Sequence, residues 1–127
     1  VTEDEFFAQS DIVSVHVPLT SETNGLVNAK WLDSFAKPII FVNSSRGSVV
    51  NTRELLDALD NGKVISTALD VLEFEGSSLE GLDSYEDSES KAVLTRLLKT
   101  PDVYLSPHVA GWTLESYIKL SKYLADK

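Results

Sequence analysis

The stretch PIIFVNSSRGSVVNTRELLDALDNGKVISTALDV, residues 38–71, determines the fold class. It contains two runs of apolar and β-branched residues, 38–45 and 63–71, and each is typical of a buried strand. Between them, residues 51–63 have the periodicity of an amphipathic helix. Strands that are apolar on both faces and alternate with helices form parallel sheets with a layer of helices on each face.

The helix within this stretch has recognisable boundaries. Asn51 can cap its first turn, and Glu54 follows three residues later, which is the spacing of a reciprocal capping box. The pair Asn61-Gly62 is typical of a helix end. The apolar face between these boundaries consists of Leu55, Leu56 and Leu59.

The same alternation continues towards both ends of the chain. Apolar runs predict further strands over residues 11–17 and 102–106. Helical patterns occur over residues 3–9, 29–35, 91–99 and 114–127. We therefore predict one α/β domain with a parallel sheet and helices on both faces.

Composition narrows the function classes. The net charge of −9 and the absence of a Lys/Arg cluster argue against binding of nucleic acid. The chain has no cysteine, which excludes disulfides and thiolate metal sites. No apolar run reaches the length of about 18 residues that a membrane-spanning helix needs, and no signal peptide is visible. We expect a cytoplasmic location, and the lack of methionine indicates a piece of a longer protein.

Residues 73–90 form a strongly acidic segment with seven acidic residues and no basic one. A loop of this length within a compact domain is unusual and indicates a functional or mobile segment. Its spacing lacks the alternating oxygen ligands and the central glycine of a calcium loop. We therefore predict no metal site.

Three residues whose side chains could bind a ligand or transfer a proton lie at the ends of predicted strands: Arg46, Asp70 and His108. Each has an ordinary alternative when taken alone. Arg46 could form an ion pair with a loop acid, Asp70 could be a solvated or helix-capping charge, and His108 could be a loop histidine. Ligands of open α/β sheets bind beyond the carboxyl ends of the strands. We therefore expect all three residues at one edge of the sheet.

Together these residues suit proton transfer beside an anionic substrate. Histidine titrates nearest to neutrality, so His108 can take and give a proton. A carboxylate on its other ring nitrogen would fix the tautomer and favour the imidazolium. The Arg46 guanidinium can capture a carboxylate through two hydrogen bonds. The set predicts reversible oxidation of a hydroxyl beside a carboxylate, given a hydride acceptor.

Four blocks of the sequence carry a family resemblance: DIVSVHVPLTSETNGLVN (11–28), FVNSSRGSVVNTRELLDAL (41–59), STALDVLEFEG (66–76) and VYLSPHVAGWT (103–113). In order and spacing they resemble the later half of the NAD-binding domain of the D-isomer-specific 2-hydroxyacid dehydrogenases, which include D-3-phosphoglycerate and D-lactate dehydrogenases. The resemblance implies the second half of a Rossmann-type domain over residues 1–127. Residues 114–127 would be the helix that leads back towards an absent substrate domain. Accordingly, the chain contains no G-x-G-x-x-G motif.

The resemblance also implies roles, residue by residue. His108 is the implied catalytic acid/base, Glu75 its carboxylate partner, and Arg46 the residue that binds the substrate carboxylate. Asp70 is implied to contact the nicotinamide carboxamide, and Gly111 to leave room beside the ring. The implied cofactor-binding residues are Pro18, Thr20, Ser44, Ser45, Asp70 and Gly111. 

Predictions also concern four positions close in sequence to the predicted site residues. His16 is predicted to be a packed core residue of the first strand, and Glu73 a bystander between the two functional acids. Gly76 stands where the family usually has a proline, and Trp112 where phosphoglycerate-type members have a small residue.

The implied reaction is hydride transfer between C2 of a D-2-hydroxy acid, with 3-phosphoglycerate as one candidate, and the nicotinamide of NAD. The resemblance further implies that the parent enzyme is a homodimer and that this piece is inactive alone. One alternative is a non-catalytic module of the same family that binds a nucleotide or dimerises. Another is a receiver-like signalling domain with Asp70 as acceptor, which would need an acidic cluster after the first strand and a lysine at a later strand end. Neither feature is present.

Overall fold

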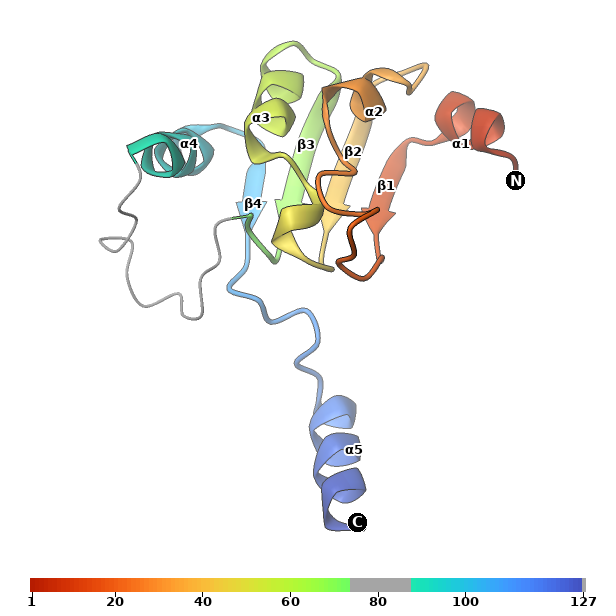
Figure 1. Cartoon of the computed structure of the whole chain (residues 1–127), viewed down its shortest axis with the longest axis vertical. Coiled ribbons are helices and arrows are strands. Elements are labelled where there is room, and N and C mark those ends of the chain that lie inside the picture. Colours follow the sequence, from red (N-terminus) through yellow and green to blue (C-terminus); the bar gives the residue numbers. More distant parts are fainter. Residues whose placement is uncertain (74–87, 127) are drawn as a thin grey trace.

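The computed structural model describes residues 1–73 and 88–126, in which helices and strands alternate as predicted (Figure 1). The strands are β1 (Ile12–Val15), β2 (Ile39–Asn43), β3 (Val64–Leu69) and β4 (Val103–Leu105). The helices are α1 (Glu3–Gln9), α2 (Ala29–Asp33), the short 3-10 helix η1 (Gly47–Val49), α3 (Thr52–Asp60), α4 (Ser88–Lys99) and α5 (Leu114–Ala125). Helix α4 begins at Ser88 rather than at residue 91, and the rest of the predicted acidic loop lies outside the described residues.

The four strands form one parallel sheet in the order β1-β2-β3-β4. One row of paired residues crosses the sheet through Val13, Phe41, Thr67 and Val103. This arrangement confirms the α/β class and the parallel sheet. It also brings the carboxyl ends of all four strands to the same edge.

The two faces of the sheet differ in their cover. On one face, Val13, Phe41 and Thr67 are buried beneath the helices. On the other, Ile12, Ile65 and Tyr104 are 66%, 58% and 65% exposed. The sequence predicts helices on both faces because the strands are apolar on both. In the described residues, the helices that bury the sheet lie on one face only (Figure 1).

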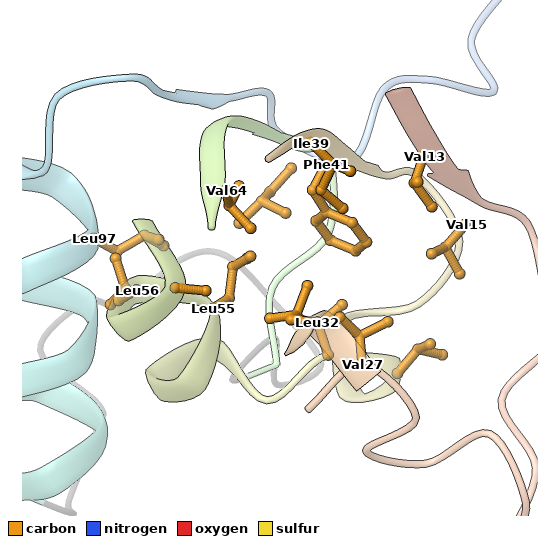
Figure 2. Close-up of a cluster of buried hydrophobic side chains, with 14 of the residues drawn as sticks. Val13, Val15, Val27, Leu32, Ile39, Phe41, Leu55, Leu56, Val64 and Leu97 are labelled. Atoms are coloured by element: carbon orange, nitrogen blue, oxygen red, sulfur yellow. The ribbon is translucent and has the colours of Figure 1, made fainter. Parts of the chain in front are cut away.

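The core lies between this covered face and the helices. Figure 2 shows strand side chains, including Ile39, Phe41 and Val64, opposite Leu32 of α2 and Leu55 of α3. Each of these five side chains is at most 1% exposed. Complete burial of side chains of this size stabilises the fold by about 1.5–3 kcal/mol each. The helix-to-sheet contact is therefore the main source of stability.

The first turn of α3 is capped as predicted by Asn51, whose side chain accepts a hydrogen bond from the Glu54 amide at 3.2 Å. The predicted reciprocal role of Glu54 is wrong. Its carboxylate instead accepts a hydrogen bond from the Ala29 amide at 2.5 Å, at the start of α2. Glu73, predicted to be a bystander between the two functional acids, has a structural contact: its carboxylate accepts a hydrogen bond from the Thr52 amide at 2.8 Å. Both acids thus satisfy amides at the starts of helices, which have no partner within the helix.

Gly47 allows the chain after β3 to pass close to the turn after β2. A Cβ atom at this position would lie 1.8 Å from the Leu72 carbonyl oxygen and 2.5 Å from the Glu73 nitrogen. No side chain fits at such distances. Gly47 therefore allows the segment that follows Asp70 to pack directly against the loop that carries Arg46.

Helix α5 stands apart from the sheet (Figure 1), and none of its residues is buried. Its apolar side chains, among them Leu114, Ile118 and Leu124, are 81%, 64% and 73% exposed. Within the described part of the chain, no helix has the length and apolarity needed to cross a membrane.

Candidate active site

The loops that follow β2, β3 and β4 leave the sheet at its carboxyl edge and carry Arg46, Asp70 and His108 (Figure 1). These three strands are neighbours in the sheet. The structure thus confirms the topological part of the prediction, that three successive strand ends deliver these residues to one edge. This is also the edge at which open α/β sheets bind ligands.

Asp70 connects the end of β3 to the loop that carries His108. Its Oδ1 accepts hydrogen bonds from the Ser106 hydroxyl at 2.5 Å and the Val109 amide at 2.9 Å. Its Oδ2 accepts a hydrogen bond from the Ala110 amide at 2.8 Å. The Asp70 carbonyl oxygen accepts a fourth bond from the His108 amide at 2.9 Å. Asp70 therefore binds the loop on both sides of the histidine.

These contacts keep the Asp70 carboxyl ionised. The side chain is buried, with 6% of the residue exposed, and burial by itself raises the pKa. The hydrogen bonds from Ser106, Ala110 and Val109, together with the nearby His108, outweigh burial and lower the pKa below its ordinary value of 3.8. The group is thus a carboxylate at neutral pH and a strong acceptor for the loop.

His108 itself is exposed at the edge of the sheet. Its backbone has a φ of 55°, which lies in the left-handed region that non-glycine residues seldom adopt. Backbone conformations of this kind persist where the surroundings hold them, and they are concentrated at functional sites. The conformation is consistent with the predicted catalytic role.

Arg46 projects from a turn organised by the buried Asn43. The Asn43 carboxamide donates to the Arg46 carbonyl oxygen at 3.0 Å and accepts from the Ser45 amide at 3.0 Å and the Ser45 hydroxyl at 2.9 Å. The Arg46 side chain is exposed, and its guanidinium donates to the Ser45 carbonyl oxygen at 2.6 Å. The ion pairs found in residues 1–73 and 88–126 do not include Arg46. The exposed guanidinium is therefore accessible to an anionic ligand within the described part of the chain.

A wide cleft of about 590 Å³ lies between the ends of β1 and β2. Its lining residues are His16, Val17, Pro18, Leu19, Ser44, Ser45 and Arg46. The structure thus brings four of the predicted site residues together. Thr20 is not among the lining residues, because its side chain takes part in a local turn with Thr23 at 3.2 Å.

A second, smaller cleft of about 250 Å³ opens beside the first, on the uncovered face of the sheet. Ser44 lines both clefts, and the smaller one also includes Asp70, Ser106 and Ala110. Gly111 follows directly, and a Cβ atom there would meet no other atom within 4 Å. The apolar floor and the few polar groups of this cleft are features of sites for planar cofactors. Such a lining suits the nicotinamide ring whose contact with Asp70 and Gly111 the family resemblance implies.

The structure corrects one prediction and leaves another outside the described residues. His16 is not a packed core residue. It is exposed, it lines the wider cleft, and its ring forms a hydrogen bond of 2.7 Å with the Ser14 hydroxyl. Glu75, the predicted partner of His108, lies outside the described residues.

Sequence reasoning missed Asn43 and Ser106 as organisers of the site. For Asn43 a signal exists, since asparagine often bonds the backbone two residues ahead, here at Ser45. For Ser106 there is none, because its partner Asp70 lies 36 residues away in the sequence. Only the pairing of β3 with β4 brings the two together.

Comparison with known proteins identifies the family. Residues 1–110 match the family described as D-isomer specific 2-hydroxyacid dehydrogenase, NAD binding domain. The chain belongs to this family. A D-lactate dehydrogenase of Treponema pallidum is 35% identical over 113 residues, which are 89% of this chain and 34% of that protein. The 2-hydroxyacid dehydrogenase A of Aspergillus oryzae is 38% identical over 117 residues, 92% of this chain and 33% of that protein.

Solved structures of the family have the same fold. The NAD-complexed D-isomer specific 2-hydroxyacid dehydrogenase of Lactobacillus delbrueckii ssp. bulgaricus has a TM-score of 0.78 at 33% identity, over 98% of this chain and 39% of that one. This likeness confirms the Rossmann-type fold, and the matched domain is one that binds NAD. The chain spans about a third of the length of the curated relatives that it matches.

Proposed function

We propose that this chain is the part of an NAD-dependent D-2-hydroxyacid dehydrogenase that carries the acid/base histidine and the substrate-binding arginine. The observation that most supports the proposal is the loop after β4, which Asp70 holds on both sides of His108 at the edge that also carries Arg46. An exposed histidine in a left-handed conformation, at the same edge of the sheet as an exposed arginine, suits chemistry on a small anion.

In the proposed reaction, His108 takes the proton of the C2 hydroxyl during oxidation and returns it to the carbonyl oxygen during reduction. Arg46 binds the carboxylate of the substrate through two hydrogen bonds and so orients C2. Glu75 is proposed to hold the His108 ring from the side opposite the substrate. Bound NAD supplies the acceptor or donor of the hydride.

The cofactor would lie along the two clefts. Pro18, Ser44 and Ser45 belong to the lining of the wider cleft, and Asp70 to that of the narrower one beside Gly111. Three of the roughly four lone-pair directions of the Asp70 carboxylate accept bonds from the loop, which leaves one at Oδ2 for the nicotinamide carboxamide. Thr20 stays a predicted contact of the adenosine side.

The substrate class follows from the names of the relatives. These include D-lactate dehydrogenases and D-specific alpha-keto acid dehydrogenases, which indicates a small 2-hydroxy or 2-oxo acid. None of these names supports 3-phosphoglycerate as the substrate. Three further predictions stay proposals. They are that the parent enzyme is a homodimer, that residues 1–127 are part of one NAD-binding domain, and that helix 114–127 leads back to a substrate domain.

The test uses the complete product of the gene that carries this sequence, assayed with NADH and a series of 2-oxo acids. His108→Ala should lower kcat by about 10²–10⁴-fold, because general acid/base catalysis contributes that much. The Kd for NADH should change little. Ser34→Ala, on the exposed end of α2, is the control and should leave both quantities unchanged. Turnover by His108→Ala close to that of the unsubstituted protein would refute the proposal and favour a non-catalytic, nucleotide-binding module.

A further inference from the structure

Ser106 has two structural roles at the end of β4. Its amide donates to the Leu69 carbonyl oxygen at 3.1 Å and so continues the pairing of β4 with β3. Its hydroxyl donates to Asp70 Oδ1 at 2.5 Å. The residue is therefore the last that belongs to the sheet and the first that belongs to the loop of His108.

The backbone between Ser106 and Ala110 needs external support. Pro107 has no amide hydrogen to donate, and His108 has a φ of 55°. A non-glycine residue in this conformation relaxes unless its neighbours hold it. The bonds from Val109 and Ala110 to Asp70 hold the loop after the histidine, and the Ser106 hydroxyl holds it before the histidine.

Ser106 also stabilises the acceptor itself. The Asp70 carboxylate is buried, and burial disfavours its charge. The Ser106 hydroxyl is the only side-chain donor that the structure gives this carboxylate within residues 1–73 and 88–126. Its removal would leave the carboxylate with two amide donors and a vacant lone pair beside the small cleft.

We propose that Ser106 is a positioning residue, which acts with Asp70 as one unit to fix the conformation of His108 at the edge of the sheet. The inference rests on the proposed acid/base role of His108 and extends it to a residue that takes no part in the proton transfer itself. Loss of the Ser106 hydroxyl leaves the imidazole present but displaced from the reacting hydroxyl. It should therefore reduce the rate of the chemical step more than binding of either ligand.

The kinetic test compares three variants of the complete gene product. Ser106→Ala should lower kcat by about 10- to 100-fold, the size of effect that a small misplacement of a catalytic group produces. The KM for the 2-oxo acid and the Kd for NADH should change much less. Ser106→Thr keeps the hydroxyl and should recover most of the lost kcat. Ser34→Ala removes a hydroxyl that donates to the Lys30 carbonyl oxygen at 3.0 Å, and should behave as the unsubstituted protein.

A second measurement does not depend on activity. In the 127-residue chain, hydrogen exchange followed by NMR should show faster exchange of the Val109 and Ala110 amides in Ser106→Ala, by about tenfold, because the local opening becomes easier. Asp70→Asn should give a larger effect, and Ser106→Thr none. Urea denaturation of each variant shows whether the whole domain remains folded.

The outcomes separate the two proposals. If Ser106→Ala matches Ser34→Ala in both kcat and amide exchange, or if Ser106→Thr fails to recover kcat, Ser106 is not a positioning residue. If His108→Ala retains turnover, the proposed function fails, and the exchange measurement alone decides whether Ser106 and Asp70 hold the loop.

Discussion

Residues 1–73 and residues 103–126 are held in place by different forces. The first region buries a continuous apolar core against one face of the sheet, with side chains such as Phe41 and Leu55 fully covered. The second region has no buried residue. Apart from the half-buried Val103, which packs against the core, it is held to the sheet by the strand pairing of β4 and by hydrogen bonds to Asp70. The proposed catalytic histidine thus lies on the part that polar contacts hold. Loss of core packing should unfold the domain, whereas loss of the polar contacts should displace the histidine and leave the fold intact.

The largest expected effect is on the core. Phe41→Ala should lower the free energy of unfolding by about 3–5 kcal/mol, because it removes a buried ring and leaves a cavity. Ile65→Ala is the matched control on the uncovered face, where the side chain is 58% exposed, and should change stability by no more than about 0.5 kcal/mol. Urea denaturation measures both. Similar losses in the two variants would mean that the uncovered face is packed against something in solution.

Gly47→Ala tests the link between the two regions. The added methyl group would overlap the Leu72 carbonyl, so the segment after Asp70 has to move, at a cost of about 1–3 kcal/mol. Gly111→Ala is the control, because its Cβ atom would meet nothing within 4 Å and should leave the stability unchanged. Thermal unfolding compares the two variants. Equal melting temperatures would contradict the close approach at Gly47.

The smallest expected effect concerns pH. Because the pKa of Asp70 is lowered in the folded protein, the ionised carboxylate stabilises the fold at pH values above 3.8, its ordinary pKa. That contribution is lost as the pH falls below 3.8 and through the lower pKa of the folded state. Asp70→Asn should remove this part of the pH dependence of the free energy of unfolding, measured by urea denaturation along a pH series. Ser106→Ala should give an intermediate dependence, since its hydroxyl is one of the donors that lower the pKa of Asp70 in the folded protein. Identical slopes for Asp70→Asn and the unsubstituted chain would contradict the assignment.

Local signals were sufficient for the elements and for part of the site. The β-branched runs, the Asn51 cap and the Asn61-Gly62 helix end are all properties of neighbouring residues, and each predicted an element that the structure contains. Arg46, Asp70 and His108 could be assigned to one edge for the same reason, because parallel strands all end on the same side. The role of Glu75 stays a prediction.

Contacts between distant residues could not be predicted in this way. Glu54 has the spacing of a capping box, yet its carboxylate binds the start of a different helix, 25 residues away. His16 continues an apolar run and yet is exposed, because it lies on the same face as Ile12 and Ser14, which the described helices leave uncovered. In both cases a long-range arrangement overrides a correct local pattern.

The sequence by itself determined the parallel α/β class, the family, and the strand ends at which chemistry is expected, because periodicity and motif order are local and survive in a single chain. Only the tertiary structure decided what holds His108 in place. Asp70 and Ser106 meet through the pairing of two strands that are far apart in sequence, and Asp70 also accepts hydrogen bonds from the loop that carries the left-handed His108. The tertiary structure also decided which face of the sheet the helices cover. Strands that are apolar on both faces can pack against helices on either face, so the sequence pattern does not distinguish the two.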